Sequence, residues 1–456
     1  MKFLRRYFGN PLLGVVDVRE VRTIRGWARH ARSAAPVTVD FFVDGKLAGS
    51  TRADRYRADL VSEVPHGRCA FEYTIPAESF DATEQTVEVR IRGAATPLAN
   101  GRFAVRIDPP QHYEAMLRDI LRDGLWALAG AVTNASLLLT GWYIAPSGRA
   151  DHRITINDRP VALRPKHGAE DFKSPLPPEF KLHAFEGDTA LDPREHELRI
   201  SFGAGQPFHP LRDYHYPLFE AAMPEPQGRV RVAGHDSAFL FNLEGYSIAR
   251  KLDALAQRYA GRPLAALGPV LDWGCGGGRT SRFLARNGVV LSGVDIDADN
   301  VRWCAQHIRG SFTTIRPEPP TAYADDFFGA IAGISVFTHL SQEYEALWLA
   351  ELARIARPGA LLFLSVLGRV AAARENLLEQ LMSDGDGFVD AGRNPGIDAV
   401  THGSAYYRNI LHRPDYVARA WGKYFEIVSI EEGIVGNYQD LVVARKRGSS
   451  RAIRSR

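Results

Sequence analysis

The chain has 456 residues, enough for two to four domains, and an ordinary globular composition with 45% apolar and 24% charged residues. Its formal net charge of +3 gives no whole-protein field of the kind that attracts nucleic acid. The three cysteines, Cys69, Cys275 and Cys304, show neither a CxxC pair nor metal-ligand spacing, so we expect no metal site and a reducing, cytoplasmic setting.

Neither end of the chain predicts a membrane anchor. No apolar run reaches the roughly 18 residues that a spanning helix needs, and residues 1–8 lack the apolar core of a signal peptide. We expect residues 447–456 to form a basic disordered tail. Contact of the basic termini with a polyanion or a membrane surface stays open.

Residues 14–108 predict a small all-β module of the sandwich type. Alternating apolar segments at 37–43 and 86–91 indicate strands, and Asp44-Gly45 favours a hairpin turn after the first of them. A charged stretch with apolar residues along one side then predicts a linker helix at 109–126.

Residues 127–222 predict a second copy of this module. Gly141-Trp142 closes a strand as Gly26-Trp27 does, and strand-like segments follow each pair in the same order with similar spacing. Such paired modules resemble the accessory β domains of sugar-processing enzymes.

Three aromatic residues of the two modules, Trp27, Trp142 and Tyr143, are candidates for stacking on a sugar ring. The alternative is that the Gly-Trp pairs only pack in the core of each module.

Residues 226–446 alternate strand and helix patterns, which predicts an α/β domain with a mostly parallel sheet and helices on both faces. A helix at 236–259 precedes the first strand. Two late strands, 424–430 and 439–444, should pair antiparallel and close a seven-stranded sheet. Between them and the fifth strand, an irregular segment at 385–411 is expected to form a wall of the substrate site.

A glycine-rich turn follows the strand at 267–273 and leads into a helix that begins near Thr280. Glycines allow a tight turn and a close approach to a ligand, and the helix N-terminus offers unpaired N–H groups. Arg279 stands where a dinucleotide fingerprint has its third glycine. The next strand ends in Asp295, whose carboxylate has two acceptor oxygens for the two hydroxyls of a ribose.

The pattern Asp272-x-Gly274-x-Gly276-x-Gly278 resembles motif I of class I S-adenosylmethionine-dependent methyltransferases. The stretches 329–340 and 353–366 are similar to the fourth strand, helix, Pro-Gly turn and fifth strand of that family, although Phe328-Gly329 replaces its usual Phe-Asp. The resemblance covers roughly residues 230–446. It implies a Rossmann-like methyltransferase domain that uses S-adenosylmethionine and needs no metal.

The resemblance also implies residue roles at the cofactor. Asp272 would orient the methionyl amino group, the glycine backbones would line methionine and ribose, Asp295 would hold the ribose hydroxyls and Ile296 would pack on adenine. Tyr246 would close over the methionine end, unless it is an ordinary packed tyrosine. A residue of the 311–326 loop should contact the adenine amino edge. The predicted set is Asp272, Trp273, Gly274, Cys275, Gly276, Gly278, Asp295, Ile296, Ser335 and Tyr246.

The acceptor is expected to be an oxygen or a free amine, because residues 335–338 lack the Asn-Pro-Pro-Tyr pattern of amide and adenine-amine methylases. An alcohol needs a general base. His339 follows the fourth strand at the carboxyl edge of the sheet and is the first candidate, unless it caps a helix or packs under the loop. His402 and His412 are its rivals.

These features together predict an S-adenosylmethionine-dependent O-methyltransferase. Its acceptor would be a glycan, a sugar-linked intermediate or another small hydroxylated molecule. Two alternatives are a non-catalytic protein that binds S-adenosylmethionine or a glycan, and a nucleic-acid methyltransferase that uses the β modules as clamps.

Overall fold

The computed structural model describes residues 11–19, 22–33, 35–57, 60–61, 67–81, 83–107, 109–133, 135–147, 153–166, 172–203, 210–394 and 406–448. The chain divides into two compact units, residues 1–119 and 120–456. None of the helices in the described ranges is long and apolar enough to cross a bilayer.

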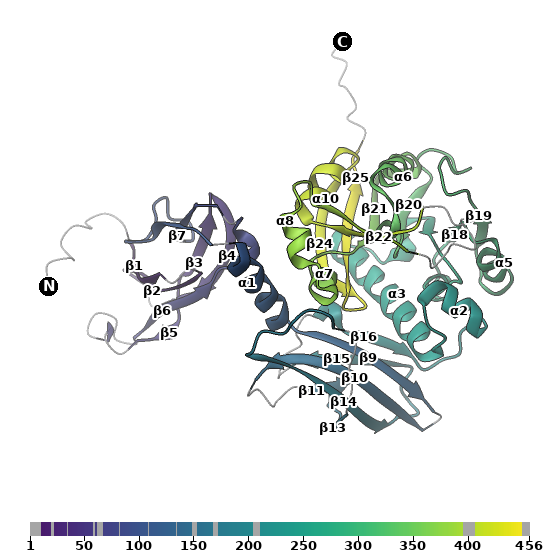
Figure 1. Cartoon of the computed structure of the whole chain (residues 1–456), viewed down its shortest axis with the longest axis horizontal. Coiled ribbons are helices and arrows are strands. Elements are labelled where there is room, and N and C mark those ends of the chain that lie inside the picture. Colours follow the sequence, from purple (N-terminus) through teal and green to yellow (C-terminus); the bar gives the residue numbers. More distant parts are fainter. Residues whose placement is uncertain are drawn as a thin grey trace, which may run out of the picture. The chain divides into compact units, whose positions relative to one another are not determined.

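The first unit contains two four-stranded antiparallel sheets, ordered β1-β2-β6-β5 and β4-β3-β7-β8 (Figure 1). Apolar side chains such as Val16, Phe41 and Phe71 fill the core between them. Asp44 and Gly45 both have positive φ, as the predicted hairpin turn requires. The strands are β1 (Leu12–Arg19), β2 (Thr23–His30), β3 (Thr38–Val43), β4 (Lys46–Arg52), β5 (Arg55–Tyr56), β6 (Arg68–Thr74), β7 (Gln85–Ile91) and β8 (Arg102–Val105).

Helix α1 (Pro109–Arg122) follows and is shorter than the predicted 109–126, because the chain already enters the next strand at Leu125. The second module begins there, with sheets ordered β13-β14-β10-β9 and β12-β11-β15-β16. Read in the opposite direction, the first of these sheets is β9-β10-β14-β13. Both sheets then repeat the strand orders of the first module, with every strand number raised by eight. Its strands are β9 (Leu125–Val132), β10 (Ser136–Pro146), β11 (Arg153–Ile156), β12 (Arg159–Pro160), β13 (Leu163–Pro165), β14 (Phe180–Ala190), β15 (Glu197–Gly203) and β16 (Tyr214–Pro217).

The two Gly-Trp pairs occupy equivalent strands, β2 and β10, and their glycines have the same packing role. A Cβ added to Gly26 would lie 2.2 Å from the Val15 carbonyl oxygen and 2.8 Å from the ring of Phe71. A Cβ on Gly141 would lie 2.1 Å from the Ala127 carbonyl oxygen and 2.9 Å from the ring of Phe185. In both modules, then, a glycine makes room for a phenylalanine of the neighbouring strand.

The burial of Trp142 matches the alternative that the Gly-Trp pair packs in the core, and it rules out this side chain as a surface platform for a sugar. Its side chain is 3% exposed, because the guanidinium of Arg374 lies 5.0 Å from the ring and Phe172 covers it edge-on. Tyr143 is half-buried and stacks on His183 with ring centroids 5.0 Å apart. Trp27 is half-buried.

The C-terminal domain has a seven-stranded sheet ordered β19-β18-β17-β20-β21-β25-β24 (Figure 1). The first five of these strands run parallel, and β25 is antiparallel to both of its neighbours. The predicted fold class, with its antiparallel C-terminal hairpin, is confirmed. The strands are β17 (Val270–Trp273), β18 (Leu291–Asp295), β19 (Ser311–Thr314), β20 (Phe328–Gly333), β21 (Ala356–Val366), β24 (Phe425–Val435) and β25 (Gln439–Lys446).

Apolar clusters cover both faces of this sheet, as a mostly parallel sheet requires. One face packs against residues such as Leu252 and Phe283, and the other against residues such as Trp348 and Leu352. The helices are α2 (Pro226–Ala233), α3 (Ala238–Ala260), α4 (Ser281–Arg286), α5 (Ala298–His307), α6 (Gln342–Ile355), α7 (Arg369–Glu375), α8 (Leu378–Ser383) and α10 (Pro414–Ala420). The irregular segment forms a hairpin of β22 (Phe388–Arg393) and β23 (Arg408–His412).

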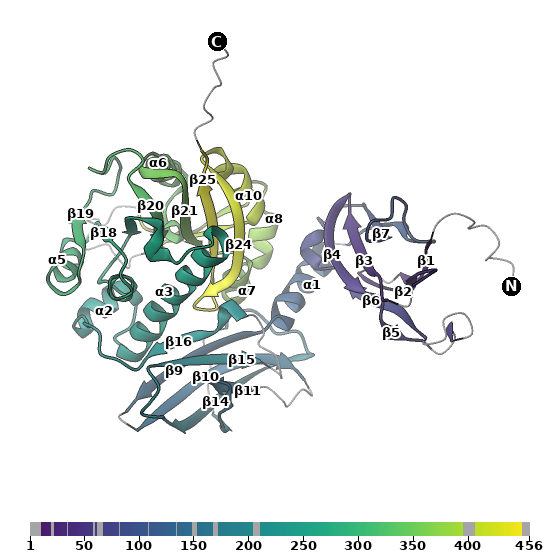
Figure 2. The ribbon, with the colours of Figure 1, turned by 180° about the vertical axis from the view of Figure 1, so that it is seen from behind.

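The second module and the C-terminal domain belong to one compact unit, and β16 runs beside α3 in both views (Figure 2). The Asn437 side-chain amide donates a hydrogen bond to the Trp126 carbonyl oxygen over 2.8 Å. The buried Arg212 guanidinium donates to the carbonyl oxygens of Gly124 and Glu432. Buried hydrogen bonds of this kind fix the module on the sheet instead of leaving it on a flexible tether.

Candidate functional site

The turn between β17 and α4 needs its glycines for conformation and for space. Gly274, Gly276 and Gly278 have φ values of 74°, 51° and 73°, in the left-handed region that other residues rarely adopt. A Cβ on Gly274 would lie 2.4 Å from Cγ2 of Val336, and one on Gly278 would lie 2.3 Å from Cδ1 of Ile308. The glycines therefore bring the backbone close to the fourth strand and to α5.

A cavity of about 560 Å³ opens beside this turn, at the carboxyl edge of β17, β18 and β20. Eight of the ten residues predicted for the cofactor line it: Asp272, Trp273, Gly274, Cys275, Gly276, Asp295, Ile296 and Ser335. Fourteen residues outside the predicted cofactor set complete the wall: Arg231, Val232, Arg279, Thr280, Asp297, Asp299, Asn300, Ile315, Ile334, Val336, Leu340, Trp348, Tyr406 and Tyr407.

Asp272 lies at the base of the cavity and is 3% exposed. The Ser281 hydroxyl donates a hydrogen bond to its carboxylate over 2.5 Å. Burial raises the pKa of Asp272 to about 6, the Ser281 hydrogen bond opposes the rise and the charge of Asp295 adds to it. Asp272 is thus a buried acid that still titrates close to neutral pH.

Asp295 ends β18 and accepts two backbone hydrogen bonds. The Gly276 N–H donates to one carboxylate oxygen over 2.7 Å, and the Asp297 N–H donates to the other over 2.9 Å. Burial raises the pKa of Asp295, while these backbone hydrogen bonds oppose the rise. Each oxygen keeps a further lone pair, since a carboxylate has about four acceptor sites.

Gly278 and Tyr246 are the two predicted cofactor residues outside the lining. Tyr246 is buried on α3, packs edge-on against Phe219 and Phe283, and donates a hydrogen bond to the Glu197 carboxylate over 2.6 Å. These contacts match the alternative of a packed tyrosine, which here joins α3 to β15 of the second module.

Helix α2 covers the glycine turn from outside. Val232 lies 3.0 Å from where a Cβ on Gly276 would be, and Arg231 forms ion pairs with Asp297 and Asp299. Asp297 is also the N-cap of α5, accepting from the N–H groups of Asp299 and Asn300. No sequence pattern pointed to Arg231 or Val232, because α2 is short and its spacing shows no apolar face.

Arg279 is a cavity residue that the sequence did mark, as the residue in place of the third fingerprint glycine. Its guanidinium lies 2.6 Å from the Glu244 carboxylate of α3. The cavity therefore combines a cation, Arg279, with the carboxylates of Asp272 and Asp295.

Ser335 holds a strained position after β20, with φ of 61°. Its N–H donates to the Ser365 hydroxyl over 2.7 Å, and its own hydroxyl receives a hydrogen bond from the Gln439 amide over 2.9 Å. From the loop at 311–326, only Ile315 lies in the cavity lining among the described residues, and it contributes an apolar contact.

Neither described histidine that was predicted as a base lines the cavity. His339 lies in a short 3-10 turn, η6 (Phe337–His339), and its Nδ1–H donates to the Arg408 carbonyl oxygen over 2.6 Å. Burial lowers the pKa of His339 to about 4, although the hydrogen bond to Arg408 opposes this shift. His402 lies outside the described residues.

His412 is fully buried at the end of β23, and its Nε2 lies 2.6 Å from the Glu345 carboxylate. Tyr416 and Trp421 also donate hydrogen bonds to Glu345, over 2.8 and 2.9 Å. This network packs β23 against α6 and α10, away from the cavity lining.

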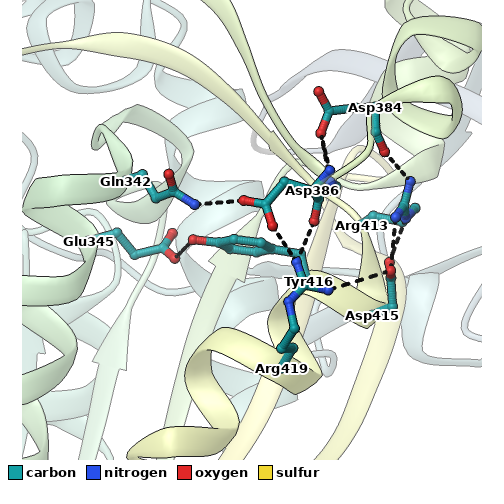
Figure 3. A network of polar contacts seen from close by, with 9 residues as sticks. Gln342, Glu345, Asp384, Asp386, Arg413, Asp415, Tyr416 and Arg419 are labelled. Carbon is teal, nitrogen blue, oxygen red and sulfur yellow. Dashed lines mark hydrogen bonds and ion pairs between the residues drawn. The ribbon is translucent and has the colours of Figure 1, made fainter.

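One ion pair and two hydrogen bonds hold residues 384–386, at the start of the irregular segment, beside that network. Figure 3 shows Gln342 and Arg419 reaching Asp386 from α6 and α10, with Arg413 donating to the Asp384 carbonyl oxygen. Within the described part of the chain, no group of three or more His, Cys, Asp or Glu side chains is placed to hold a metal ion.

Comparison with known proteins matches residues 271–364 to a family described as "Methyltransferase domain". A ubiquinone biosynthesis O-methyltransferase of Agrobacterium fabrum is 34% identical over 119 residues, which cover 25% of this chain and 46% of the relative. One of a Chelativorans species is 28% identical over 182 residues, covering 39% and 66%. A solved S-adenosylmethionine-dependent methyltransferase of Methanosarcina mazei has 19% identity and a TM-score of 0.30, covering 39% and 92%.

The chain thus spans less than half the length of the Agrobacterium relative. The matched segment contains the glycine turn, Asp295 and the first strands of the sheet. Residues 271–364 therefore match a methyltransferase domain, and they lie within the mostly parallel, Rossmann-like sheet of the C-terminal domain.

Proposed function

We propose that the C-terminal domain binds S-adenosylmethionine in the cavity beside the glycine turn and transfers its methyl group to an oxygen of a small hydroxylated acceptor. The observation that carries this proposal is the joint placement of Gly276, Asp272 and Asp295 around one cavity.

The charges of the cavity fit the cofactor. The carboxylate of Asp272 suits a cationic amino group, and the guanidinium of Arg279 suits a carboxylate. Asp295 has acceptor sites left for two ribose hydroxyls, and Ile296 with Ile315 offers apolar contact for the adenine ring.

S-adenosylmethionine would supply a sulfonium methyl carbon. An O–C bond would form while the C–S bond breaks and leaves its electron pair on sulfur, and the hydroxyl proton of the acceptor would pass to solvent water. The protein's part is alignment, which is worth up to about 7–11 kcal/mol in favourable cases. Val336, Leu340 and Trp348 give the cavity an apolar wall, which would help to exclude water from a bound acceptor.

Beyond methyl transfer to oxygen, the class of molecule that accepts the methyl group can be proposed. A glycan or sugar-linked acceptor was predicted from the paired β modules, and the burial of Trp142 removes one of the aromatic residues behind it. The curated relatives carry the name of ubiquinone biosynthesis, which supports a small molecule instead. Both classes share a hydroxyl oxygen as the methylated atom.

Two measurements test the proposal on the full chain. Calorimetry should detect S-adenosylmethionine binding, and its absence would remove the proposed function. Methyl-labelled S-adenosylmethionine should then label one of two panels, small phenols or free sugars and oligosaccharides. We expect turnover to survive a chelator; binding without transfer to either panel would instead favour a non-catalytic binding protein.

A further inference from the structure

The rings of Tyr407 and His339 stack on each other, with centroids 3.8 Å apart and planes inclined by 27°. Tyr407 lines the cavity and His339 does not. The tyrosine is therefore the member of this pair that a bound molecule meets, and the histidine supports it from behind.

Hydrogen bonds hold both rings in place. His339 donates from Nδ1 to the Arg408 carbonyl oxygen over 2.6 Å and from its backbone N–H to the Val336 carbonyl oxygen over 3.0 Å. The Tyr407 carbonyl oxygen accepts from the Asn394 N–H over 2.9 Å. The stacked pair is thus fixed to β22, β23 and the turn after β20, which favours a positioning role over a mobile one.

The Tyr407 hydroxyl is a polar group of the cavity to which the proposed cofactor contacts assign no role. It has no hydrogen-bond partner in the described part of the chain, whereas the neighbouring Tyr406 hydroxyl donates to the Pro317 carbonyl oxygen over 3.1 Å. Burial raises the pKa of Tyr407, the Asp295 carboxylate adds to the rise and the Arg279 guanidinium opposes it. Asp295 and Arg279 line the same cavity as Tyr407.

We propose that Tyr407 is the residue that positions the acceptor, through a hydrogen bond between its hydroxyl and the oxygen that receives the methyl group. His339 is a positioning residue that acts through the Tyr407 ring and not a general base. The inference rests on the proposed methyl transfer to oxygen. It assigns to His339 a role that needs no protonation change, in keeping with its Nδ1–H bond to a carbonyl oxygen.

The test measures the affinity of the full chain, saturated with S-adenosylhomocysteine, for two hydroxylated probes. One is 4-nitrocatechol, followed by its visible absorbance, and the other is N-acetylglucosamine, followed by calorimetry. Tyr407→Phe removes the hydroxyl and keeps the stack. The loss of one hydrogen bond predicts about five- to tenfold weaker binding of whichever probe the wild type binds.

Tyr259→Phe is the matched control, because it removes a hydroxyl bonded to Glu431 outside the cavity. It should leave the probe affinity unchanged, and both variants should bind S-adenosylhomocysteine within about twofold of the wild type, since the hydroxyl is assigned to the acceptor. Equal probe affinities for Tyr407→Phe and the wild type would overturn the proposal. So would a wild type that binds S-adenosylhomocysteine and neither probe, whereas no S-adenosylhomocysteine binding at all would be a failure of the proposed function.

A double-mutant cycle tests the part assigned to His339. His339→Phe keeps a flat ring but loses the bond to Arg408, so probe binding should weaken and the Tyr407→Phe/His339→Phe pair should bind no worse than Tyr407→Phe alone. The pH dependence of turnover should be the same in His339→Phe and the wild type. Normal probe binding with turnover lost and its pH profile altered would restore His339 as the base.

Discussion

The backbone N–H of Gly276 donates a hydrogen bond to the carboxylate of Asp295 over 2.7 Å, across 19 residues of sequence. The two features that suggested a nucleoside site are therefore parts of one structure. The turn orients the acid, and the acid satisfies an N–H that the positive φ of Gly276 directs toward it. A second N–H, from Asp297, fixes the other oxygen, so that the carboxylate is aligned before any ligand binds.

Asp295→Asn should weaken S-adenosylmethionine binding more than tenfold. The amide keeps one acceptor oxygen, but its NH₂ group faces a backbone donor, and hydrogen bonds to a charged acceptor are worth about 1.5–3 kcal/mol each. Calorimetry of the purified variant measures the effect. Asp188→Asn, which alters an exposed aspartate on β14 paired with Arg164, is the control and should bind normally. Unchanged affinity in Asp295→Asn would remove the ribose assignment.

The pKa of Asp272, raised to about 6 chiefly by burial, predicts how binding depends on pH. A cationic amino group needs the ionised carboxylate, so S-adenosylmethionine affinity should fall about tenfold for each pH unit below 6. Asp272→Asn should bind weakly at every pH and show no such slope. Calorimetry between pH 5 and 8 measures both proteins, and a parallel slope in the variant would assign the titration to another group.

The same raised pKa has a consequence for stability without ligand. In the folded protein the pKa of Asp272 is about 6, above its ordinary value of 3.8, so folding favours the protonated carboxyl. The stability gained in this way is complete below about pH 3.8 and is lost as the pH rises through 6. Asp272→Asn should therefore unfold at a higher temperature than the wild type at pH 8, with a smaller difference at pH 5. A melting temperature lowered equally at both pH values would show that the carboxylate is needed for folding in its ionised form.

Local sequence signals were sufficient for the sheet and for the turn. The spacing of Gly274, Gly276 and Gly278 predicts positive φ at each, and an acid after the next strand can only reach the same edge of a parallel sheet. The positions of His339 and Tyr246 were foreseeable in chain order but their contacts were not. His339 donates a hydrogen bond to the Arg408 carbonyl oxygen of β23, and Tyr246 donates one to the Glu197 carboxylate of the second β module.

Residues that reach the cavity from irregular or short segments had a weaker signal or none: Tyr407 was expected only as part of the substrate wall at 385–411, and nothing marked Arg231. Arg231 comes from an eight-residue helix, and Tyr407 from the end of the segment between β22 and β23. No periodicity fixes which way such side chains point, and long-range contacts alone decide it. Arg279 was visible as a departure from the dinucleotide fingerprint, and its pairing with Glu244 needed the fold.

Arg231→Gln should speed the release of S-adenosylmethionine. Its ion pairs with Asp297 and Asp299 join α2 to the start of α5 above the glycine turn, and its side chain is 41% exposed. A pair this exposed is worth at most about 1 kcal/mol, which predicts a two- to fivefold faster dissociation. Stopped-flow fluorescence can follow the release through Trp273 and Trp348, which line the cavity.

Arg302→Gln is the matched control, because Arg302 pairs with the same Asp299 from within α5 and leaves α2 untouched. Its dissociation rate should equal that of the wild type. The Arg231→Gln effect should also shrink at high salt, as screening weakens the pair in the wild type. Equal rates for the two variants would mean that α2 is held by Val232 and its backbone alone.

Glu345→Gln should destabilise the domain by at least about 2 kcal/mol, because Glu345 is buried and is bonded to His412, Tyr416 and Trp421. Figure 3 shows the contact with Tyr416. An amide has one acceptor oxygen for these groups and presents its own donors to them. Urea unfolding measures the loss, and Glu343→Gln, an exposed change on the same helix, should cost much less. His412→Gln should likewise lower stability while turnover well below the melting temperature persists. A His412→Gln variant that is stable and inactive would instead make His412 the base, and the Glu345 network its support.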